Sequence, residues 1–329
     1  MPLMREKRFN MGGFRLRAAV EAERSERLKR TRLWRYLAQP SLRLADRMLR
    51  TKRNGNGHST GATASRRFGV PRIEPAELRR RVDEVNWYHT IDLGDGIVTP
   101  GAVDCRSIAR HCGLPASLAG KRVIDVGTCD GFWAFEMENR NAAEVVATDL
   151  SSLADYDVPR KKREQIVQQG EQTLADVGLA PVGSGFQLAH EALGSKVKRE
   201  IVNVYELSPE KVGMFDLTFV GYLLVHLRDP QTALENIFSV TQDRVLIVEP
   251  VARELEGMDR PLSTFVGTSY LGVWWEHNTH SWELMMRTAG FQDIEVVGRE
   301  DLDFDLGENQ VQMSTVALTG RVPPALRTS

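Results

Sequence analysis

Cysteine is scarce in this chain of 329 residues: there are three, Cys105, Cys112 and Cys129, and none is spaced as Cys-x-x-Cys. An odd number without that spacing indicates neither a disulfide framework nor a zinc site, so we expect a reducing, cytoplasmic compartment and no bound metal. No apolar run reaches the roughly 18 residues of a transmembrane helix, and no apolar signal-peptide core lies near the start. We therefore expect no transmembrane segment and no secretion signal.

The glycine motif of dinucleotide-binding proteins, Gly-x-Gly-x-x-Gly, is also absent. The apolar run 123–126 has the pattern of a buried parallel strand and is followed by Gly127 and, four positions later, Gly131. Cys129 and Phe132 stand where the second and third glycines of that motif would be. The turn therefore lacks glycines on which the pyrophosphate of NAD would lie, while the N-terminus of the following helix still offers unpaired N–H groups to an anionic group.

The residues after this turn complete a layout that holds an adenosine. Phe132 begins a helical stretch, and a second apolar run, Val145–Ala147, stops shortly before Asp149, 22 residues after Gly127. Strand, glycine turn, helix, strand and acid form half of a Rossmann fold. We expect the two Asp149 oxygens to bind both ribose hydroxyls and Leu150 to pack on the adenine.

The same alternation of strand and helix patterns continues along the chain and predicts an α/β fold. Helices are expected over 186–195, 230–241 and 281–289. Strands are expected over 200–204, 215–221, 244–249, 294–297 and 311–318, with a polar loop between the last two.

Four segments carry a resemblance to a known family: Trp87–Leu93, Gly96–Gly101, Asp125–Glu136 and Gly221–Pro230. They are similar to class I S-adenosyl-L-methionine (SAM) methyltransferases, and more narrowly to a bacterial group related to the tRNA wobble-uridine (mo5U34) methyltransferases. The resemblance, and not periodicity, implies SAM as cofactor and a Rossmann-like seven-stranded sheet of order 3-2-1-4-5-7-6 with helices on both faces. It implies an N-terminal helical cap over the cofactor in residues 71–120 and a SAM-binding methyltransferase domain in 121–329.

The best-known member of that family uses carboxy-SAM, and two departures disfavour this cofactor here. The resemblance places a tyrosine that reads the extra carboxylate at the position of Val225, and lysines ahead of the glycine turn. The segment 87–101 contains neither lysine nor arginine. Because a carboxylate without a cation is costly to desolvate, ordinary SAM and simple methyl transfer are favoured. Cys129, where many relatives have tryptophan, is expected to affect packing and not chemistry.

The glycine turn is expected to hold the methionine end of the cofactor. Gly127, Thr128, Asp130 and Gly131 would surround it, and Asp125, at the end of the preceding strand, would orient the turn or reach the amino group through water.

Further cofactor contacts are expected at the ends of later strands. The resemblance implies that Asn203, at the place of an acid in relatives, meets the adenine amino group beside Val204. Gly221 and Tyr222 would lie beside the methyl sulfonium. Since a sulfonium cation favours aromatic faces, Trp87 and Trp133 are candidates together with Tyr222, although core packing explains each equally well.

A hydroxyl acceptor would require a general base. His226 is the first candidate because it follows the fourth strand near the sheet edge where ligands bind. His89 is the second and Glu249, at the end of the fifth strand, the third. For His277 and His280, in an aromatic loop rich in tryptophan, a structural role is favoured, although that loop could form a wall of the acceptor pocket.

The first 70 residues differ from the others in charge. They hold 18 Lys and Arg against 5 Asp and Glu, whereas the remainder of the chain has a net charge of −14. Trp34 and several leucines at near-helical spacing, followed by the Gly-, Ser- and Asn-rich stretch 51–65, predict a basic helical or disordered extension with a flexible linker. Two interpretations of this extension stay open: peripheral contact with a membrane surface or a nucleic acid, and a solvated extension without such a contact.

These observations favour a SAM-dependent methyltransferase that acts on a small-molecule or sugar-containing acceptor, with transfer to oxygen preferred. An RNA-modifying enzyme of the wobble-uridine type is the first alternative, and the acidic body of the chain disfavours it because phosphates would be repelled. A SAM-binding module without catalysis is the second.

Overall fold

The computed structural model describes residues 73–161, 163–164, 167–168, 182–270, 272–305 and 310–326. The predicted basic extension, 1–70, lies outside the described residues. Among the described helices, none combines the length and apolar character needed to cross a bilayer.

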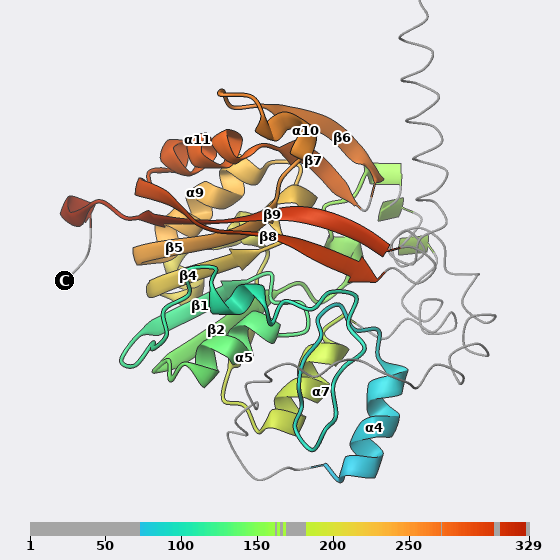
Figure 1. The fold of residues 1–329 in the computed structure, drawn as a ribbon. Helices are drawn as coiled ribbons and strands as arrows, with labels where there is room; N and C mark the ends of the chain where they lie inside the picture. Colours follow the sequence, from blue (N-terminus) through green and yellow to red (C-terminus); the bar gives the residue numbers. More distant parts are fainter. Residues whose placement is uncertain are drawn as a thin grey trace, which may run out of the picture.

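A seven-stranded sheet forms the centre of the molecule, in the order β3-β2-β1-β4-β5-β9-β8 (Figure 1). Counted within this sheet alone, the order is 3-2-1-4-5-7-6, which confirms the predicted Rossmann-like methyltransferase fold. A separate hairpin, β6–β7, is inserted after β5. The strands are β1 (Arg122–Val126), β2 (Glu144–Asp149), β3 (Lys198–Ile201), β4 (Phe215–Gly221), β5 (Thr241–Pro250), β6 (Ser263–Tyr270), β7 (Val273–His277), β8 (Gln292–Asp305) and β9 (Gln310–Arg321).

The central strands are apolar because both of their faces are covered. Val123, Ile124 and Val126 of β1 are almost completely buried, as are Phe219 and Val220 of β4. β1 pairs in parallel with β2 on one side and with β4 on the other. Continuous β-branched and aromatic runs of this kind are typical of parallel strands between two helical layers.

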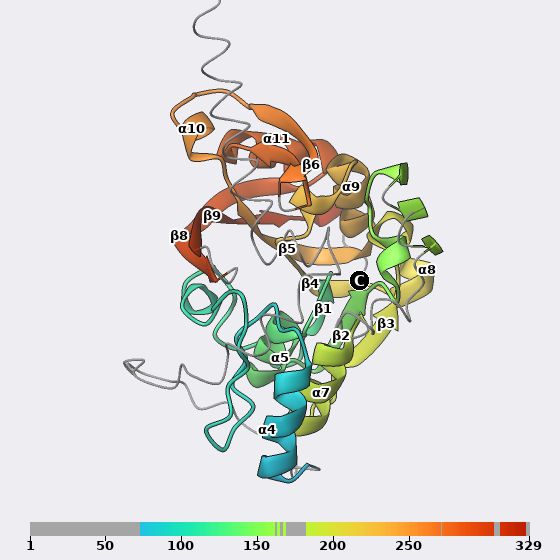
Figure 2. The same cartoon turned by 90° about the vertical axis from the view of Figure 1, so that its right-hand side faces the viewer.

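Helices cover both faces of the sheet (Figures 1 and 2). The strand order reverses between β1 and β4, so right-handed crossovers place the helix that follows β1 and the helix that follows β4 on opposite faces. Figure 2 shows α4 beside α7, far from α9 and α11. Among the fully described elements, the helices of four or more residues are α4 (Pro75–Glu84), α5 (Phe132–Asn139), α7 (Ser184–Leu193), α8 (Pro209–Val212), α9 (Pro230–Val240), α10 (Arg253–Glu256) and α11 (Thr279–Ala289).

The segment ahead of the sheet is helical only in part. After α4 it runs mainly as irregular chain with isolated bridges, among them His89↔Val103 and Val103↔Phe304. Its apolar side chains, such as Trp87 and Leu93, belong to the same buried cluster as the sheet. The expected helical cap is therefore wrong in its secondary structure over most of 85–120, and the segment is packed as part of the main core.

Two further differences concern edge elements. The predicted loop between the last two strands is mostly strand, because β8 continues to Asp305 and pairs with β9 along its length. The tryptophan-rich segment expected as a loop is instead strand β7, paired antiparallel with β6, followed by α11. β3 begins two residues earlier and ends three residues earlier than expected, and most of its residues are exposed.

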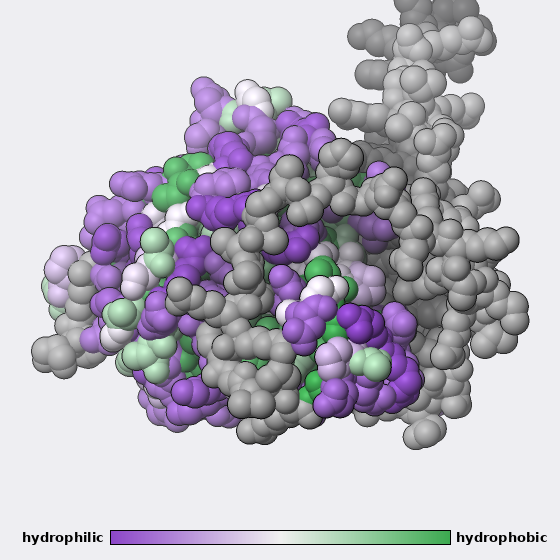
Figure 3. Space-filling view, turned by 60° about the horizontal axis from the view of Figure 1, so that its bottom comes forward, coloured by the Kyte–Doolittle hydropathy of each residue, from purple (hydrophilic) through white to green (hydrophobic). Residues whose placement is uncertain are grey.

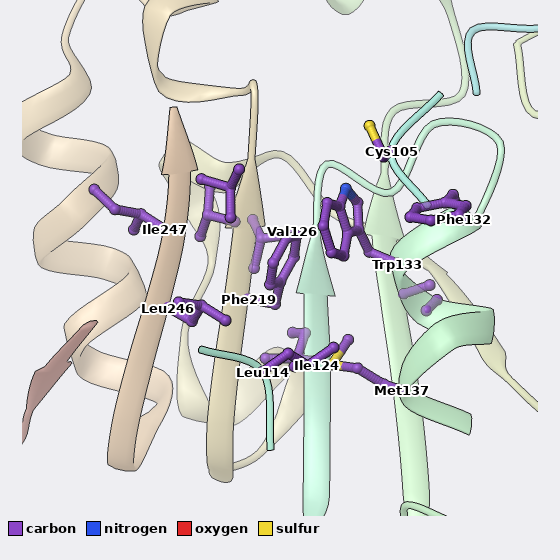
Figure 4. Packing of buried hydrophobic residues seen from close by; sticks show 14 of the residues in the cluster. Cys105, Leu114, Ile124, Val126, Phe132, Trp133, Met137, Phe219, Leu246 and Ile247 are labelled. Carbon is purple, nitrogen blue, oxygen red and sulfur yellow. The ribbon is translucent and has the colours of Figure 1, made fainter. Parts of the chain in front are cut away.

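Aromatic side chains fill the core between the sheet and α5 (Figure 4). Trp133 packs on Phe219 with ring centroids 4.4 Å apart and meets Phe132 edge to face at 5.1 Å. On the face in Figure 3, the visible described surface is mostly hydrophilic, with apolar residues in small separate patches. Most of the large apolar side chains of the described residues lie in the core.

A close backbone approach at Gly101 holds the segment ahead of the sheet in place, and it leads to a test. A Cβ on Gly101 would lie 2.1 Å from the His89 carbonyl carbon and 2.2 Å from the Thr90 nitrogen. We expect Gly101→Ala to lower the free energy of unfolding by about 1–3 kcal/mol or more, as overpacking does. Urea unfolding would measure this. Gly257→Ala, where nothing lies within 4 Å, is the matched control and should change it by less than about 0.5 kcal/mol. Equal stability of the two variants would contradict the packing described here.

Candidate functional site

The candidate site lies at the carboxyl ends of the central strands, where the strand order reverses. Val126 at the end of β1 pairs with Val220 of β4 and with Thr148 of β2. The neighbouring strands β4 and β5 end at Gly221 and Pro250. This edge at the reversal point is where open α/β sheets bind their ligands. The predicted turn, the predicted ribose ligand and two of the predicted bases therefore belong to one edge of the sheet.

The glycine turn follows β1 directly and begins α5. Gly127 and Gly131 have φ of +78° and +91°, a region in which a side chain is strained. At Gly131 a Cβ would also lie 2.5 Å from the Phe135 ring, so glycine is required there on two grounds. Cys129 has a positive φ of +53° without being glycine. The Gly127 and Thr128 N–H groups donate to the Thr148 carbonyl, which ties the turn to the end of β2.

Asp125, next to the last residue of β1, points into the turn and is almost completely buried. The Thr128 hydroxyl donates to its Oδ2 at 2.7 Å. Burial raises the pKa of Asp125 to about 7, against the opposing effect of the Thr128 hydrogen bond. This geometry supports the first of its two expected roles, the orientation of the turn.

Asp149, the expected ribose ligand, ends β2 beside the turn. Its Oδ2 accepts from the Cys129 N–H at 2.9 Å and its Oδ1 from the Leu150 N–H at 2.7 Å. Burial raises its pKa, opposed by the Leu150 N–H, the Arg199 charge and the Cys129 N–H. Each oxygen keeps a further lone pair, so the carboxylate can accept from a pair of hydroxyl groups while it holds the turn.

Asp130 links the turn to the segment ahead of the sheet. Its Oδ2 accepts from the backbone N–H groups of Tyr88 at 2.6 Å and His89 at 2.9 Å. Burial raises the pKa of Asp130 to about 6, although both N–H groups act in the opposite direction. The sequence placed Asp130 among the cofactor contacts, whereas its hydrogen bonds hold Tyr88 and His89 over the turn.

His89 is 5% exposed and stacks on Phe132 with ring centroids 5.6 Å apart. Its Nδ1 is buried and has no hydrogen-bond partner, and the Asp130 Oδ2 lies 4.0 Å away, beyond hydrogen-bonding distance. Burial lowers its pKa to about 3, so the ring is neutral at pH 7. His89 is thus a neutral imidazole whose buried Nδ1 makes no hydrogen bond.

Asn203 and Val204, both expected at the adenine, lie at the start of a short helix. The Asn203 Oδ1 accepts from the Tyr205 N–H at 3.0 Å and so caps the short 3₁₀ helix η5 (Val204–Glu206). Val204 is buried within that helix. Asn203 follows the end of β3 by two residues, and its carbonyl oxygen keeps a second lone pair beside the Tyr205 N–H, so the expected contact with adenine stays a prediction.

The aromatic candidates for the sulfonium divide into core residues and one residue of the sheet edge. The Trp87 Nε1 donates to the Val82 carbonyl at 3.0 Å, and the Trp133 ring lies on Phe219 inside the core. Tyr222 follows Gly221 at the end of β4 with a φ of +52° and bonds through its hydroxyl to Thr315 of β9. The core-packing interpretation is therefore favoured for Trp87 and Trp133.

Glu249 is the penultimate residue of β5 and is fully buried. Its Oε1 accepts from the Leu223 and Leu224 N–H groups, both at 2.9 Å, while its Oε2 is buried without a partner. Burial raises its pKa to about 8, against the effect of those backbone donors. The carboxyl group thus caps the 3₁₀ helix η6 (Leu224–His226), which carries the first candidate base.

His226 ends η6, beside the turn of the β6–β7 hairpin. Its Nδ1 lies 3.2 Å from the Gly272 carbonyl. Because a carbonyl only accepts, Nδ1 carries the proton and the Nε2 lone pair is left for a proton from elsewhere. Burial lowers the pKa of His226, opposed by the Gly272 hydrogen bond, so the neutral form is favoured.

Sequence reasoning missed the residues that the β8–β9 hairpin brings to this edge. Phe304 of β8 lies 5.5 Å from the Tyr222 ring and 6.3 Å from the Tyr88 ring. The Asp305 N–H donates to the Ala102 carbonyl at 2.8 Å, which joins the hairpin to the segment ahead of the sheet. Because Phe304 is about 80 residues beyond Tyr222 in the chain, no local pattern indicates this neighbourhood.

The two histidines of the tryptophan-rich segment make packing, hydrogen-bond and ion-pair contacts within the chain. His277 is buried, its Nδ1 is 2.7 Å from the Ser263 hydroxyl, and its ring packs on Trp282 at 4.1 Å. His280 lies 3.6 Å from Glu283 on the surface of α11. These contacts agree with the structural role that the sequence favoured.

The buried acidic groups give the site its electrostatic character. Asp125, Asp130, Asp149 and Glu249 are all held by hydroxyl or backbone donors, and burial raises the pKa of each. Of the four, only Asp149 has its pKa lowered by a cation, Arg199. Such a site favours a ligand that brings positive charge.

No family model matches the chain, and no curated protein matches it. Solved structures resemble it at low identity. The N-terminal domain of EvdMO1, in the presence of S-adenosylhomocysteine (SAH) and D-fucose, is 17% identical, with 78% of this chain and 100% of that chain covered and a TM-score of 0.49.

Two further structures are less similar. Magnesium protoporphyrin IX methyltransferase (ChlM) from Synechocystis PCC 6803 with bound SAH is 13% identical over 78% of this chain and 92% of its own, at a TM-score of 0.41. An O-methyltransferase family protein from Burkholderia thailandensis is 13% identical over 66% of this chain and 56% of its own, at 0.40. The narrower resemblance to wobble-uridine tRNA methyltransferases finds no support among these structures.

The raised pKa of Glu249 predicts how stability depends on pH. In the folded chain Glu249 keeps its proton up to about pH 8, whereas its usual value is 4.5. Between these values unfolding releases a proton, so this group lowers the free energy of unfolding as the pH rises. Gln cannot ionise and keeps an oxygen for the Leu223 and Leu224 donors. We therefore expect Glu249→Gln to gain stability over the natural chain progressively from pH 5 to pH 8.

Urea unfolding at several pH values would test this expectation. Glu235→Gln, at an exposed position of α9, is the matched control and should show no such trend. A constant difference between Glu249→Gln and the natural chain across this pH range would mean that the carboxyl group is already ionised at pH 5.

Proposed function

We propose that this protein is a SAM-dependent methyltransferase that transfers the methyl group to a hydroxyl of a small-molecule or sugar-containing acceptor. The observation that carries the proposal is the Gly127–Gly131 turn with the Asp149 carboxylate beside it, at the edge of the sheet where its strand order reverses. This arrangement supplies a backbone turn for the methionine end and an acid for the ribose of one adenosine cofactor.

Charge supports SAM over a dinucleotide. A pyrophosphate brings two negative charges. The carboxyl groups of Asp125, Asp130 and Asp149 already lie at this turn, so they would repel those charges when ionised. SAM has a sulfonium and an ammonium against a single carboxylate. Its net positive charge would favour ionisation of these groups, so the site and the cofactor are electrostatically complementary.

Ordinary SAM is preferred to carboxy-SAM. Val225, at the position where the resemblance implies a carboxylate-reading tyrosine, is 2% exposed and packed in the main core. Neighbouring Glu249 presents an unpartnered carboxyl oxygen and no cation. An additional carboxylate would therefore meet no positive partner from these residues.

In the proposed reaction the chain aligns the acceptor and receives its proton. SAM supplies a methyl group on a sulfonium, which is a good leaving group. The His226 Nε2 accepts the acceptor's hydroxyl proton, and the Gly272 carbonyl holds the Nδ1–H so that the ring keeps this tautomer. Glu249 acts as a positioning residue by capping the helix that carries His226. Tyr222 and Phe304 would bound the acceptor side.

A small acceptor is preferred to RNA. Residues 71–329 carry a net charge of −14, which opposes a phosphate backbone. Peripheral contact of the basic extension with a membrane or a nucleic acid stays a separate proposal, because those residues lie outside the described ones.

The ribose assignment is tested by changing Asp149. Each charge-assisted hydrogen bond that is lost should cost about 1.5–3 kcal/mol, so we expect Asp149→Ala to weaken SAM binding at least about tenfold. Asp149→Asn keeps an oxygen for the Cys129 N–H and removes the charge, so it separates ribose binding from turn geometry. Titration calorimetry measures both. Asp259→Ala, at an exposed position, is the control. Unchanged affinity in both Asp149 variants would refute the proposed cofactor site.

The base is tested by changing His226. An acceptor is first chosen from a panel of sugars and aromatic alcohols by measuring the release of SAH. With this acceptor, His226→Gln should lower kcat by a factor of about 10²–10⁴ and leave the SAM Kd unchanged. Since the pKa of His226 is lowered from 6.5, the acidic limb of the natural enzyme's kcat profile should lie below pH 6.5. His280→Gln, on the surface of α11, is the control. Full turnover by His226→Gln would assign the proton to another group.

A further inference from the structure

A histidine, a cysteine and an aspartate that are far apart in the sequence meet above the glycine turn. His89, Cys129 and Asp130 each offer one ligand atom, and these atoms lie within 4.8 Å of one another. His89 and Asp130 are buried, and Cys129 is half-buried. The cluster is therefore mostly enclosed, and Cys129 is its least buried member.

The distances are close to those that a metal ion imposes. Ligand atoms at 2.0–2.3 Å around a tetrahedral ion lie about 3.3–3.6 Å from one another. The Cys129 Sγ is 3.7 Å from the Asp130 Oδ1, and the His89 Nδ1 is 4.0 Å from the Asp130 Oδ2. These two contacts involve different Asp130 oxygens, and one ligand atom from each residue lies within 4.8 Å of the others, so side-chain movements of about 1–1.5 Å would bring three atoms into coordination.

His89 supplies the independent indication of a ligand. Its Nδ1 is buried without any hydrogen-bond partner, which is costly unless something binds there. The ring is fixed between Phe132, on which it stacks, and Tyr88, which it meets edge to face at 4.7 Å. The orphan nitrogen is consequently held beside the Asp130 carboxylate.

The partners of Asp130 fit this role as well. Its Oδ2 accepts from the Tyr88 and His89 N–H groups, the kind of support that orients a metal-binding carboxylate. Its Oδ1 has the Cys129 thiol as its contact. This oxygen is thus available once the thiol proton has left.

We propose that His89, Cys129 and Asp130 form a binding site for one thiophilic divalent cation, of the chemical class of Zn²⁺ and Co²⁺. On binding, the Cys129 Sγ–H bond breaks, its proton goes to solvent, and the sulfur electron pair coordinates the ion, together with the neutral His89 nitrogen and the Asp130 carboxylate. A thiolate, an imidazole and a carboxylate suit a borderline-soft ion, and three protein ligands leave the fourth position open. This inference does not rest on the proposed methyl transfer.

Cobalt titration of the untagged full-length chain, without SAM, tests the site. We expect one equivalent of Co²⁺ to bind with a thiolate-to-cobalt charge-transfer absorption and to be displaced by Zn²⁺. Cys129→Ser should abolish that absorption and weaken binding at least about tenfold. Cys112→Ala removes a buried cysteine outside the cluster and should keep both.

A second variant keeps the proposal testable if Cys129→Ser does not fold. His89→Gln leaves the thiol in place and should also weaken Co²⁺ binding at least about tenfold. Circular dichroism and thermal melting identify which variants fold. No thiolate absorption in the natural chain, or undiminished Co²⁺ binding in a folded Cys129→Ser or His89→Gln variant, would overturn the proposal. Neither result bears on SAM binding, which calorimetry measures separately.

Discussion

Two hydrogen bonds to one buried carboxylate join the two parts of the site. Asp130 belongs to the turn that begins α5, and its Oδ2 receives the N–H groups of Tyr88 and His89 from the segment ahead of the sheet. The position of Asp130 is set in turn by Gly131, where a side chain would collide with Phe135. The packing of a regular helix therefore fixes where the irregular segment lies beside the glycine turn. His89 and Tyr88 reach the site because of this connection.

The second constraint on this edge of the sheet is the burial of carboxyl groups with little positive charge beside them. Four carboxyl groups are held by backbone or hydroxyl donors, and the pKa of each is raised because desolvation outweighs those donors. The same burial lowers the pKa of His89 and keeps its ring neutral. Together these groups make an interior that tolerates a net positive ligand better than an anionic one. The proposed cofactor and the proposed metal ion both satisfy this condition.

The sequence predicted best the strands whose two faces are both buried. The strand over 215–221 has the predicted bounds because nearly every residue in it is apolar. β3 and β8 were misplaced or shortened because they lie at the edges of the sheet, where residues such as Lys198, Asp301 and Asp303 face solvent and mask the strand pattern. Motif spacing similarly predicted the glycine turn and the position of Asp149 at the end of the next strand, whereas the ribose contact of Asp149 stays a prediction. It could not show that Asn203 caps a helix, nor that His89 and Cys129 meet across 40 residues, because both depend on tertiary contacts.

Hydrogen bonding separates the roles of the two bases expected at the ends of β4 and β5. Glu249 is turned back toward the chain, where its Oε1 is taken by the first N–H groups of the helix that ends in His226. The other side of His226 is fixed by the Gly272 carbonyl, from the hairpin inserted after β5. The imidazole is thus held from the core through the capped helix and from outside through the hairpin. Because both contacts leave Nε2 unused, the proposed role as base falls to the oriented His226 and not to the more deeply buried Glu249.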